Sequence, residues 1–214
     1  MIVTPDEAMI FGTTIHNIVV LYYDKIDNDT RIDEIDMRLD EAFVEGGNWL
    51  TDRRKTRVRT IQNNFKEFEK NRIKNKINKP ILLEHSTTHD LFPDLPPIKG
   101  IVDAYYEDVG MAVDWKTGKY EEMTDDRMIQ GKIYEMLLKE DGYPVKKVLF
   151  NNLNLGRQLT LPKITDGWIQ KEISQMVDMV HADRFPKKES GLCNGWCPYI
   201  LSCHFDGICP WSDI

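Results

Sequence analysis

The sequence predicts a single mixed domain of the α/β (α+β) class, in which helices flank a central sheet that is partly antiparallel. Three observations predict it. The first third of the chain has helical spacing, the middle has short β-branched and aromatic runs between turn formers, and helical and strand-like segments then alternate. A chain of 214 residues is long enough to bury a substantial core.

Helices are expected over the first 79 residues. Residues 5–23 (PDEAMIFGTTIHNIVVLYY) suit a helix, because Pro5 and the two acids after it fit a first helical turn. An acidic stretch at 24–45 indicates a loop and a second helix, and a basic helical region ends before Pro80. Residues 24–79 are therefore expected to be a helical, basic insertion within one domain of residues 1–214.

Five strands and two more helices are expected after this insertion. PILLEHSTTH, PPIKGIVDAYYED and GMAVDWKTG are separated by turn formers and read as three strands. Residues 125–138 return to helical spacing, and VKKVLFNNL and RQLTL look like two further strands. A last helix from Thr165 to Asp183 is capped by Thr165 or Asp166.

The net charge of −7 is unevenly distributed along the chain. From Asp52 to Lys79, eleven Lys and Arg stand against three acids. A solvated face of a docked helix explains such a run, but a basic outer face also suits a phosphate backbone. The candidate nucleic-acid contacts are Arg53, Arg54, Lys55, Arg57 and Arg59.

The sequence contains no stretch near the roughly 20 apolar residues of a membrane span. The start, MIVTPDEAMIFG, lacks the basic residues and apolar core of a secretory signal. We therefore expect an intracellular, cytoplasmic protein, in the host cytoplasm if the source is a virus, and no membrane partner.

The segment GIVDAYYEDVGMAVDWKTGKY (100–120) places charged residues inside two predicted strands. If the turn is centred on residues 108–109, Asp103 and Asp114 face each other with Cβ atoms about 4.5 to 5.5 Å apart, and Lys116 shares their face. Opposed carboxylates destabilise a sheet unless a cation lies between them, and Mg²⁺ favours one or two carboxylates. Lys116 then helps to orient or deprotonate a water molecule bound to the metal.

A solvent-facing hairpin with an Asp, Lys, Asp surface pattern is the other interpretation. D-x-K alone favours it, because motifs this short often occur by chance. A three-residue bulged loop would also shift the register of the hairpin.

Four motifs, taken in order, resemble the RecB-like branch of the PD-(D/E)XK nucleases. They are G-x-x-x-H from Gly12 to His16, G-x-x-D from Gly100 to Asp103, D-x-K from Asp114 to Lys116, and Q-x-x-x-Y from Gln130 to Tyr134. Each motif is weak alone, and their order and spacing carry the resemblance. It implies a restriction-endonuclease-like fold, with a mixed central sheet flanked by helices.

The resemblance also implies roles for the matching residues. His16, Asp103 and Asp114 would ligate Mg²⁺ or Mn²⁺, with the backbone carbonyl of Trp115 as a further ligand. Glu84, in the preceding strand, is a secondary candidate, adjacent to the metal. The implied catalytic residues are Asp103, Asp114, Lys116, Gln130 and Tyr134, of which the last two lie one helical turn apart and position nucleic acid.

All four cysteines fall within the last 22 residues, at Cys193, Cys197, Cys203 and Cys209. In an intracellular chain such a group indicates metal rather than disulfides, so residues 190–214 are expected to be a Cys-rich metal-binding segment. It resembles the [4Fe-4S] segment of CRISPR-associated and AddB-type exonucleases, except that no cysteine precedes His16 and that the first gap, Cys193 to Cys197, is one residue longer than the usual C-x2-C. A [4Fe-4S] cluster on four local thiolates, zinc, no metal, and loss of an N-terminal cysteine all stay open.

The resulting hypothesis is a metal-dependent deoxyribonuclease. The resemblance favours an exonuclease on single-stranded DNA or duplex ends, in recombination, repair, phage DNA processing or CRISPR adaptation, working with a helicase or integrase. Trp115, Tyr120 or Tyr134 would stack on bases if exposed. The alternatives are a catalytically silent nucleic-acid-binding or adaptor subunit of a helicase or integrase complex, and a small zinc-bearing interaction protein.

Overall fold

The computed structural model describes residues 7–46, 55–119 and 122–182. The helices are α1 (Glu7–Asp24), the 3-10 helix η1 (Ile32–Glu34), α2 (Ile35–Gly46), α3 (Lys55–Lys74), α4 (Asp125–Glu140) and α5 (Asp166–His181). The strands are β1 (Leu82–His89), β2 (Ile98–Tyr106), β3 (Met111–Lys116), β4 (Lys147–Asn152) and β5 (Arg157–Thr160). The order of elements agrees with the one that the sequence predicts.

The described strands form one mixed sheet in the order β1-β2-β3-β4-β5. Strand β3 pairs in parallel with β4, and the other three pairs are antiparallel. Helix α4 lies in the crossover between β3 and β4, which a parallel pair requires. The predicted mixed sheet of an α+β domain is therefore confirmed.

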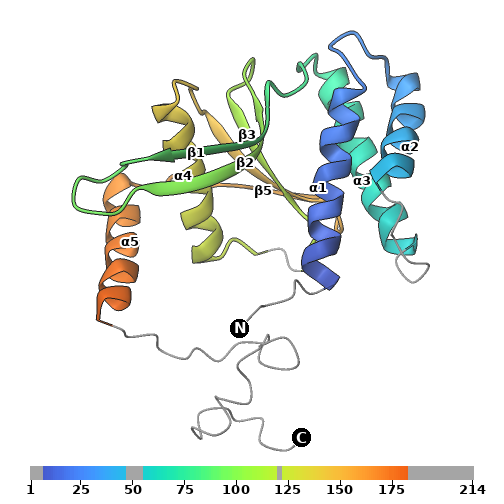
Figure 1. The fold of residues 1–214 in the computed structure, drawn as a ribbon. Helices are drawn as coiled ribbons and strands as arrows, with labels where there is room; N and C mark the ends of the chain where they lie inside the picture. The colour runs from blue at the N-terminus through green and yellow to red at the C-terminus, as the bar shows by residue number, and fades with distance from the viewer. Residues whose placement is uncertain (1–6, 47–54, 120–121, 183–214) are drawn as a thin grey trace, which may run out of the picture. The chain divides into compact units, whose positions relative to one another are not determined.

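Helices cover both faces of this sheet (Figure 1). Helices α1, α2 and α3 pack on one face, called here the α1 face, around Phe11, Phe65 and Trp115. Helix α4 packs on the opposite face, the α4 face, where Tyr134 meets Phe150. The side chains of the central strands therefore lie between helices on either side.

Local sequence signals explain where the elements begin and end. Thr124 is the N-cap of α4, and its hydroxyl accepts a hydrogen bond from Arg127 N. Helix α3 ends where Lys76 takes a φ of 56°. The turn between β2 and β3 is closed by Gly110, which has a φ of 61° and whose N–H donates to Glu107 O at 3.1 Å.

The chain divides into two compact units at Ile169, within α5. The sheet, helices α1 to α4 and the candidate site all belong to the first unit. Of the second unit the structure describes residues 170–182, the larger part of α5. None of the helices in the described ranges is long and apolar enough to cross a membrane.

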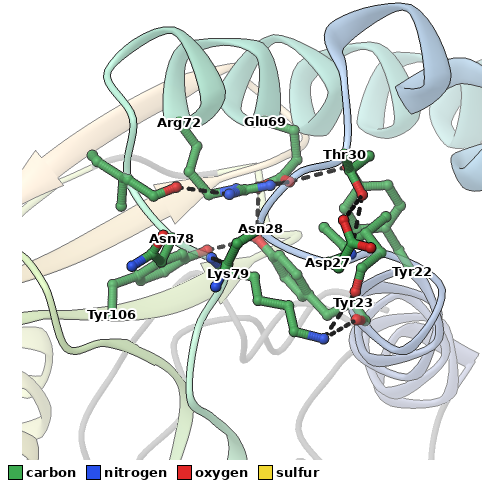
Figure 2. Close-up of polar contacts among 12 residues, drawn as sticks. Tyr22, Tyr23, Asp27, Asn28, Thr30, Glu69, Arg72, Asn78, Lys79 and Tyr106 are labelled. Carbon is green, nitrogen blue, oxygen red and sulfur yellow. Dashed lines mark hydrogen bonds and ion pairs between the residues drawn. The ribbon is translucent and has the colours of Figure 1, made fainter.

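A buried polar network joins α1, α3 and β2 (Figure 2). Glu69 of α3 is fully buried, accepts hydrogen bonds from the hydroxyls of Tyr22 at 3.0 Å and Tyr23 at 2.7 Å, and pairs with Arg72 at 2.9 Å. The hydroxyls of Tyr23 and Tyr106 lie 2.6 Å apart. A buried charge requires such partners, so the network fixes α1 and α3 against β2.

The fold uses several cations of the basic region itself. Lys66 pairs with Asp36 of α2, and Lys70 pairs with Glu67. Lys79 donates to two backbone carbonyls near the C-terminal end of α1, at 3.2 and 2.8 Å. Part of the positive charge of this segment, at Lys66 and Lys79, therefore joins it to α2 and to the end of α1, whatever else it binds.

Candidate active site

The hairpin of β2 and β3 has the register that its turn predicts. Ala104 pairs with Val113, and Tyr106 with Met111, around a turn at 107–110. The same register places Asp103 opposite Asp114. The ladder between β2 and β3, however, ends at Ala104 and Val113, while β3 continues beside β4 to Lys116. The two aspartates therefore lie in a fork, where β2 and β3 separate.

Both aspartates are buried in this fork, with 6% of Asp103 and 2% of Asp114 exposed. Asp103 Oδ2 accepts a hydrogen bond from the backbone N–H of Trp115 at 2.7 Å. Burial and the charge of Asp114 raise the pKa of Asp103 to about 7. Burial also raises the pKa of Asp114, although Lys116 opposes the effect. Two neighbouring buried carboxylates are an environment that a cation stabilises.

One amide connects the catalytic candidates on the α4 face. Gln130 Oε1 accepts from Lys116 Nζ at 2.9 Å, and Gln130 Nε2 donates to Asp114 Oδ1 at 3.0 Å and to the Tyr134 hydroxyl at 2.8 Å. Lys116 Nζ also lies 2.8 Å from Asp114 Oδ2. These partners fix the orientation of the amide. The structure thus brings together the predicted lysine, glutamine, tyrosine and second aspartate.

His16 approaches the fork from α1. Its Nδ1 lies 3.2 Å from Glu84 Oε1 and 3.6 Å from Asp103 Oδ2, and its Nε2 donates to the carbonyl of Trp115 at 2.9 Å. Burial lowers the pKa of His16, but the hydrogen bond with Glu84 and the charges of Asp103 and Glu84 outweigh it and raise the pKa to about 9. The imidazole therefore sits in a strongly negative environment.

The donor set at His16 fits a divalent cation. One ligand atom each from His16, Glu84 and Asp103 lies within 4.8 Å of the others. Carboxylate oxygens suit Mg²⁺ and Mn²⁺, while an imidazole nitrogen is a ligand that Mg²⁺ seldom takes. The chemistry of the set therefore favours Mn²⁺ at least as much as Mg²⁺. Asp114 lies outside this group and is held by Lys116 and Gln130.

Glu84 enters this group through an unusual backbone conformation. Its φ is 47°, in the left-handed region, which costs a residue with a Cβ about 1 to 2 kcal/mol. Pairing with β2 keeps one register on both sides, Leu83 with Ala104 and His85 with Val102, so Glu84 lies opposite Asp103. The sequence places Glu84 below the other candidates, because the left-handed backbone that brings it to His16 leaves no signal in the pattern of residues around it.

The alternation of side chains in β2 breaks opposite Glu84. Ala104 packs on the α1 face, whereas Val102 packs on the α4 face. Residues two apart face the same way in a regular strand, so the strand twists locally at Asp103. Both strands are therefore irregular where they carry acids of the candidate site.

Gly100 explains the glycine of the G-x-x-D motif. A Cβ at this position would lie 2.5 Å from Leu137 Cδ1 of α4. The glycine allows α4 to approach β2 closely, which in turn places Gln130 and Tyr134 over the sheet. The motif thus combines a packing residue with an acid of the site.

The predicted nucleic-acid contacts are only partly within the described residues. Arg57 donates to the carbonyl of Thr117, in the loop after Lys116, and its guanidinium lies 4.4 Å from the centre of the Phe11 ring. Arg59 is exposed. The rings of Trp115 and Tyr134 are buried, so the condition for stacking on bases is not met there. The predicted residues outside the described ranges are Arg53, Arg54, the side chain of Lys55, Tyr120, and Cys193, Cys197, Cys203 and Cys209 of the segment 190–214.

The chain matches the model of one protein family and is similar to a solved structure. The family model for the PD-(D/E)XK nuclease superfamily matches residues 3–204. No curated protein matches the chain. Among solved structures, one described as "Crystal structure of SSO0001" is similar at 15% identity and a TM-score of 0.38. That similarity covers 67% of this chain and 65% of the other, so the chain spans just under two thirds of its length.

Proposed function

Because the chain belongs to the PD-(D/E)XK nuclease superfamily, a superfamily of metal-dependent nucleases, we propose that it is a Mg²⁺- or Mn²⁺-dependent deoxyribonuclease. We propose further that it acts as an exonuclease on single-stranded DNA or duplex ends. The observation that carries the proposal is the fork between β2 and β3. There Asp103, Asp114 and Lys116 meet His16 from one helix and Gln130 from another.

The ligands of the ion would be His16 Nδ1, Glu84 and Asp103, with Asp114 completing the set across the fork. A divalent cation at this place supplies positive charge to the phosphate and activates water for attack. The carbonyl of Trp115 accepts the His16 Nε2 hydrogen bond at 2.9 Å. It thereby directs Nδ1 toward the carboxylates, and because a carbonyl oxygen has a second lone pair, the same atom would serve as the further ligand of the ion.

Lys116 and Tyr134 supply the remaining polar chemistry. The Lys116 ammonium group, held between Asp114 and Gln130, orients the attacking water and stabilises negative charge developing on the phosphate. The Tyr134 hydroxyl accepts a hydrogen bond from Gln130, so its own proton is directed to another acceptor. Burial raises the pKa of Tyr134 further above its ordinary value, as do the charges of Asp114 and Asp103. The hydroxyl therefore stays protonated and is suited to bind a phosphate oxygen.

The test is cleavage of single- and double-stranded DNA labelled at the 5′ or the 3′ end, with Mg²⁺ or Mn²⁺. Wild type is compared with Asp114→Ala, Lys116→Ala, and Glu140→Gln as a control at an exposed position of α4. Cleavage that is lost in the first two variants and kept in the control supports the proposal. The label pattern separates exonuclease from endonuclease action. A folded wild type that binds DNA and Mn²⁺ but cuts neither substrate contradicts it, and favours the catalytically silent adaptor subunit.

The wider proposal includes the segment 190–214 and the cellular setting. Four thiolates in a single nuclease domain of residues 1–214 would hold a [4Fe-4S] cluster or zinc. Metal analysis of the purified protein distinguishes iron with sulfide from stoichiometric zinc. The setting proposed is cytoplasmic DNA recombination, repair, phage DNA processing or CRISPR adaptation, together with a helicase or integrase. Co-purification with such a partner from the source organism tests it.

A further inference from the structure

Directly after Glu84, three side chains of β1 converge on one carboxylate beyond the end of α4. They belong to alternate residues, His85, Thr87 and His89, and so share a face of the strand. His85 Nε2 donates to Asp141 Oδ2 at 2.8 Å, His89 Nε2 donates to Asp141 Oδ1 at 2.6 Å, and Thr87 Oγ1 donates to Oδ1 at 3.1 Å. We call this group the Asp141 clasp.

The clasp connects the edge of the sheet to the helix on the α4 face. Asp141 is the C-cap of α4, and β1 is an edge strand of the described sheet. Burial raises the pKa of Asp141, but hydrogen bonds from His85, His89 and Thr87 outweigh it and lower the pKa. Asp141 is therefore a carboxylate at neutral pH, and hydrogen bonds to an ionised acceptor are the strong ones.

The backbone of Glu84 is the part of β1 that needs such a restraint. Its φ of 47° is unfavourable for a residue with a Cβ, and a strained residue persists only when its surroundings hold it. On one side, Leu83 packs into the core of the α1 face. On the other side, His85 begins the clasp. Glu84 is thus held by a hydrophobic contact before it and a polar contact after it.

We propose that Asp141 is a positioning residue of the metal site. The clasp holds the left-handed backbone of Glu84, so that the Glu84 carboxylate faces His16 and Asp103. Without the clasp, β1 relaxes toward ordinary extended backbone and the carboxylate leaves the ligand group. The inference rests on the proposed function in one respect, that Glu84 ligates the ion.

Mn²⁺ binding to the full chain, measured by titration calorimetry without DNA, tests this role. We expect Asp141→Ala to weaken Mn²⁺ binding by about tenfold, the lower end of what loss of an outer-shell partner costs. Glu84→Gln should weaken binding by a similar factor. In the Glu84→Gln background, Asp141→Ala should cause no further loss, because the clasp acts only through that carboxylate. Glu140→Ala, which removes an exposed acid beside Asp141, should leave the affinity unchanged.

Each outcome decides the inference. An unchanged affinity in Asp141→Ala overturns it, and so does an equal loss in the Glu84→Gln background, which would indicate a general effect on the fold. If Asp141→Ala does not fold, His89→Gln, which removes one of the three bonds, should give a smaller loss in the same direction, and no loss overturns the inference. A folded wild type that binds no Mn²⁺ overturns the proposed metal site and this inference with it. A wild type that binds Mn²⁺ beside an unaffected Asp141→Ala overturns this inference alone, so the two failures are distinguishable.

Discussion

Gln130 is the residue whose replacement should most clearly separate chemistry from folding. Gln130→Met keeps the length of the side chain and a high helix propensity. It removes the hydrogen bonds with Lys116, Asp114 and Tyr134. We expect DNA cleavage to slow while the melting temperature changes little, because the main packing contacts of α4 come from other residues, such as Leu138.

The size of the effect follows from the partners. Two of the three are ionised, and a hydrogen bond to a charged group contributes about 1.5 to 3 kcal/mol. If one such bond is lost from the transition state, the cleavage rate falls by about 10- to 150-fold. Lys116 keeps its contact with Asp114 Oδ2 at 2.8 Å, so the loss should remain smaller than that of Lys116→Ala.

The assay is single-turnover cleavage of labelled DNA at saturating Mn²⁺, where binding does not mask the chemical step. Glu140→Gln on the same helix is the control, and thermal melting is recorded for every variant. A cleavage rate within about twofold of wild type, with a normal melting temperature, would refute the role assigned to Gln130. A slower rate matched by loss of folded protein would refute the separation of chemistry from folding.

The remaining predictions concern the stability of the fold. Glu69→Ala removes the carboxylate that pairs with buried Arg72 and should lower the free energy of unfolding by about 3 to 5 kcal/mol in urea denaturation. Glu69→Leu with Arg72→Met should recover part of this loss but not all of it, because the buried Tyr22 hydroxyl loses its acceptor; a double variant no more stable than the single one contradicts this. The pKa of His16, raised from 6.5 to about 9, means that the folded state binds this proton more tightly than the unfolded chain, so the stabilisation is complete below pH 6.5 and is lost as pH rises to about 9. The melting temperature in a chelating buffer should therefore fall over that range, and fall less in His16→Gln. Gly110→Ala puts a Cβ 2.8 Å from Pro144 O at a φ of 61°. It should therefore lower the free energy of unfolding by about 1 to 2 kcal/mol, and an unchanged melting temperature would contradict this prediction.

The element types and their order could be predicted because their signals are local. Hydrophobic periodicity separates the helices from the strands, and turn residues mark the boundaries between them. The register of the β2 and β3 hairpin was also accessible, because a four-residue turn ending in Gly110 determines which residues face each other. Asp103 and Asp114 could thus be placed opposite each other from the sequence alone.

The membership of the candidate cation site could not be predicted in the same way. Glu84 joins His16 and Asp103 through a left-handed backbone that no residue type at this position signals, and through a contact with α1 that lies far away in the sequence. The basic region shows the same limitation. The helical spacing of Glu69 and Arg72 indicates an ion pair, but only tertiary structure shows that the pair is buried.

The fork between β2 and β3 also determines the distance between the two aspartates. The strands separate after the last pair of the ladder, Ala104 with Val113, and both residues are fully buried. Asp103 and Asp114 lie on the two strands just beyond this pair, so the distance between their carboxylates depends on the angle at which the strands separate. In the proposed metal site, that distance would decide which cation the two carboxylates can share. The choice of ion would then depend in part on two small apolar side chains of the sheet core that carry no ligand atom.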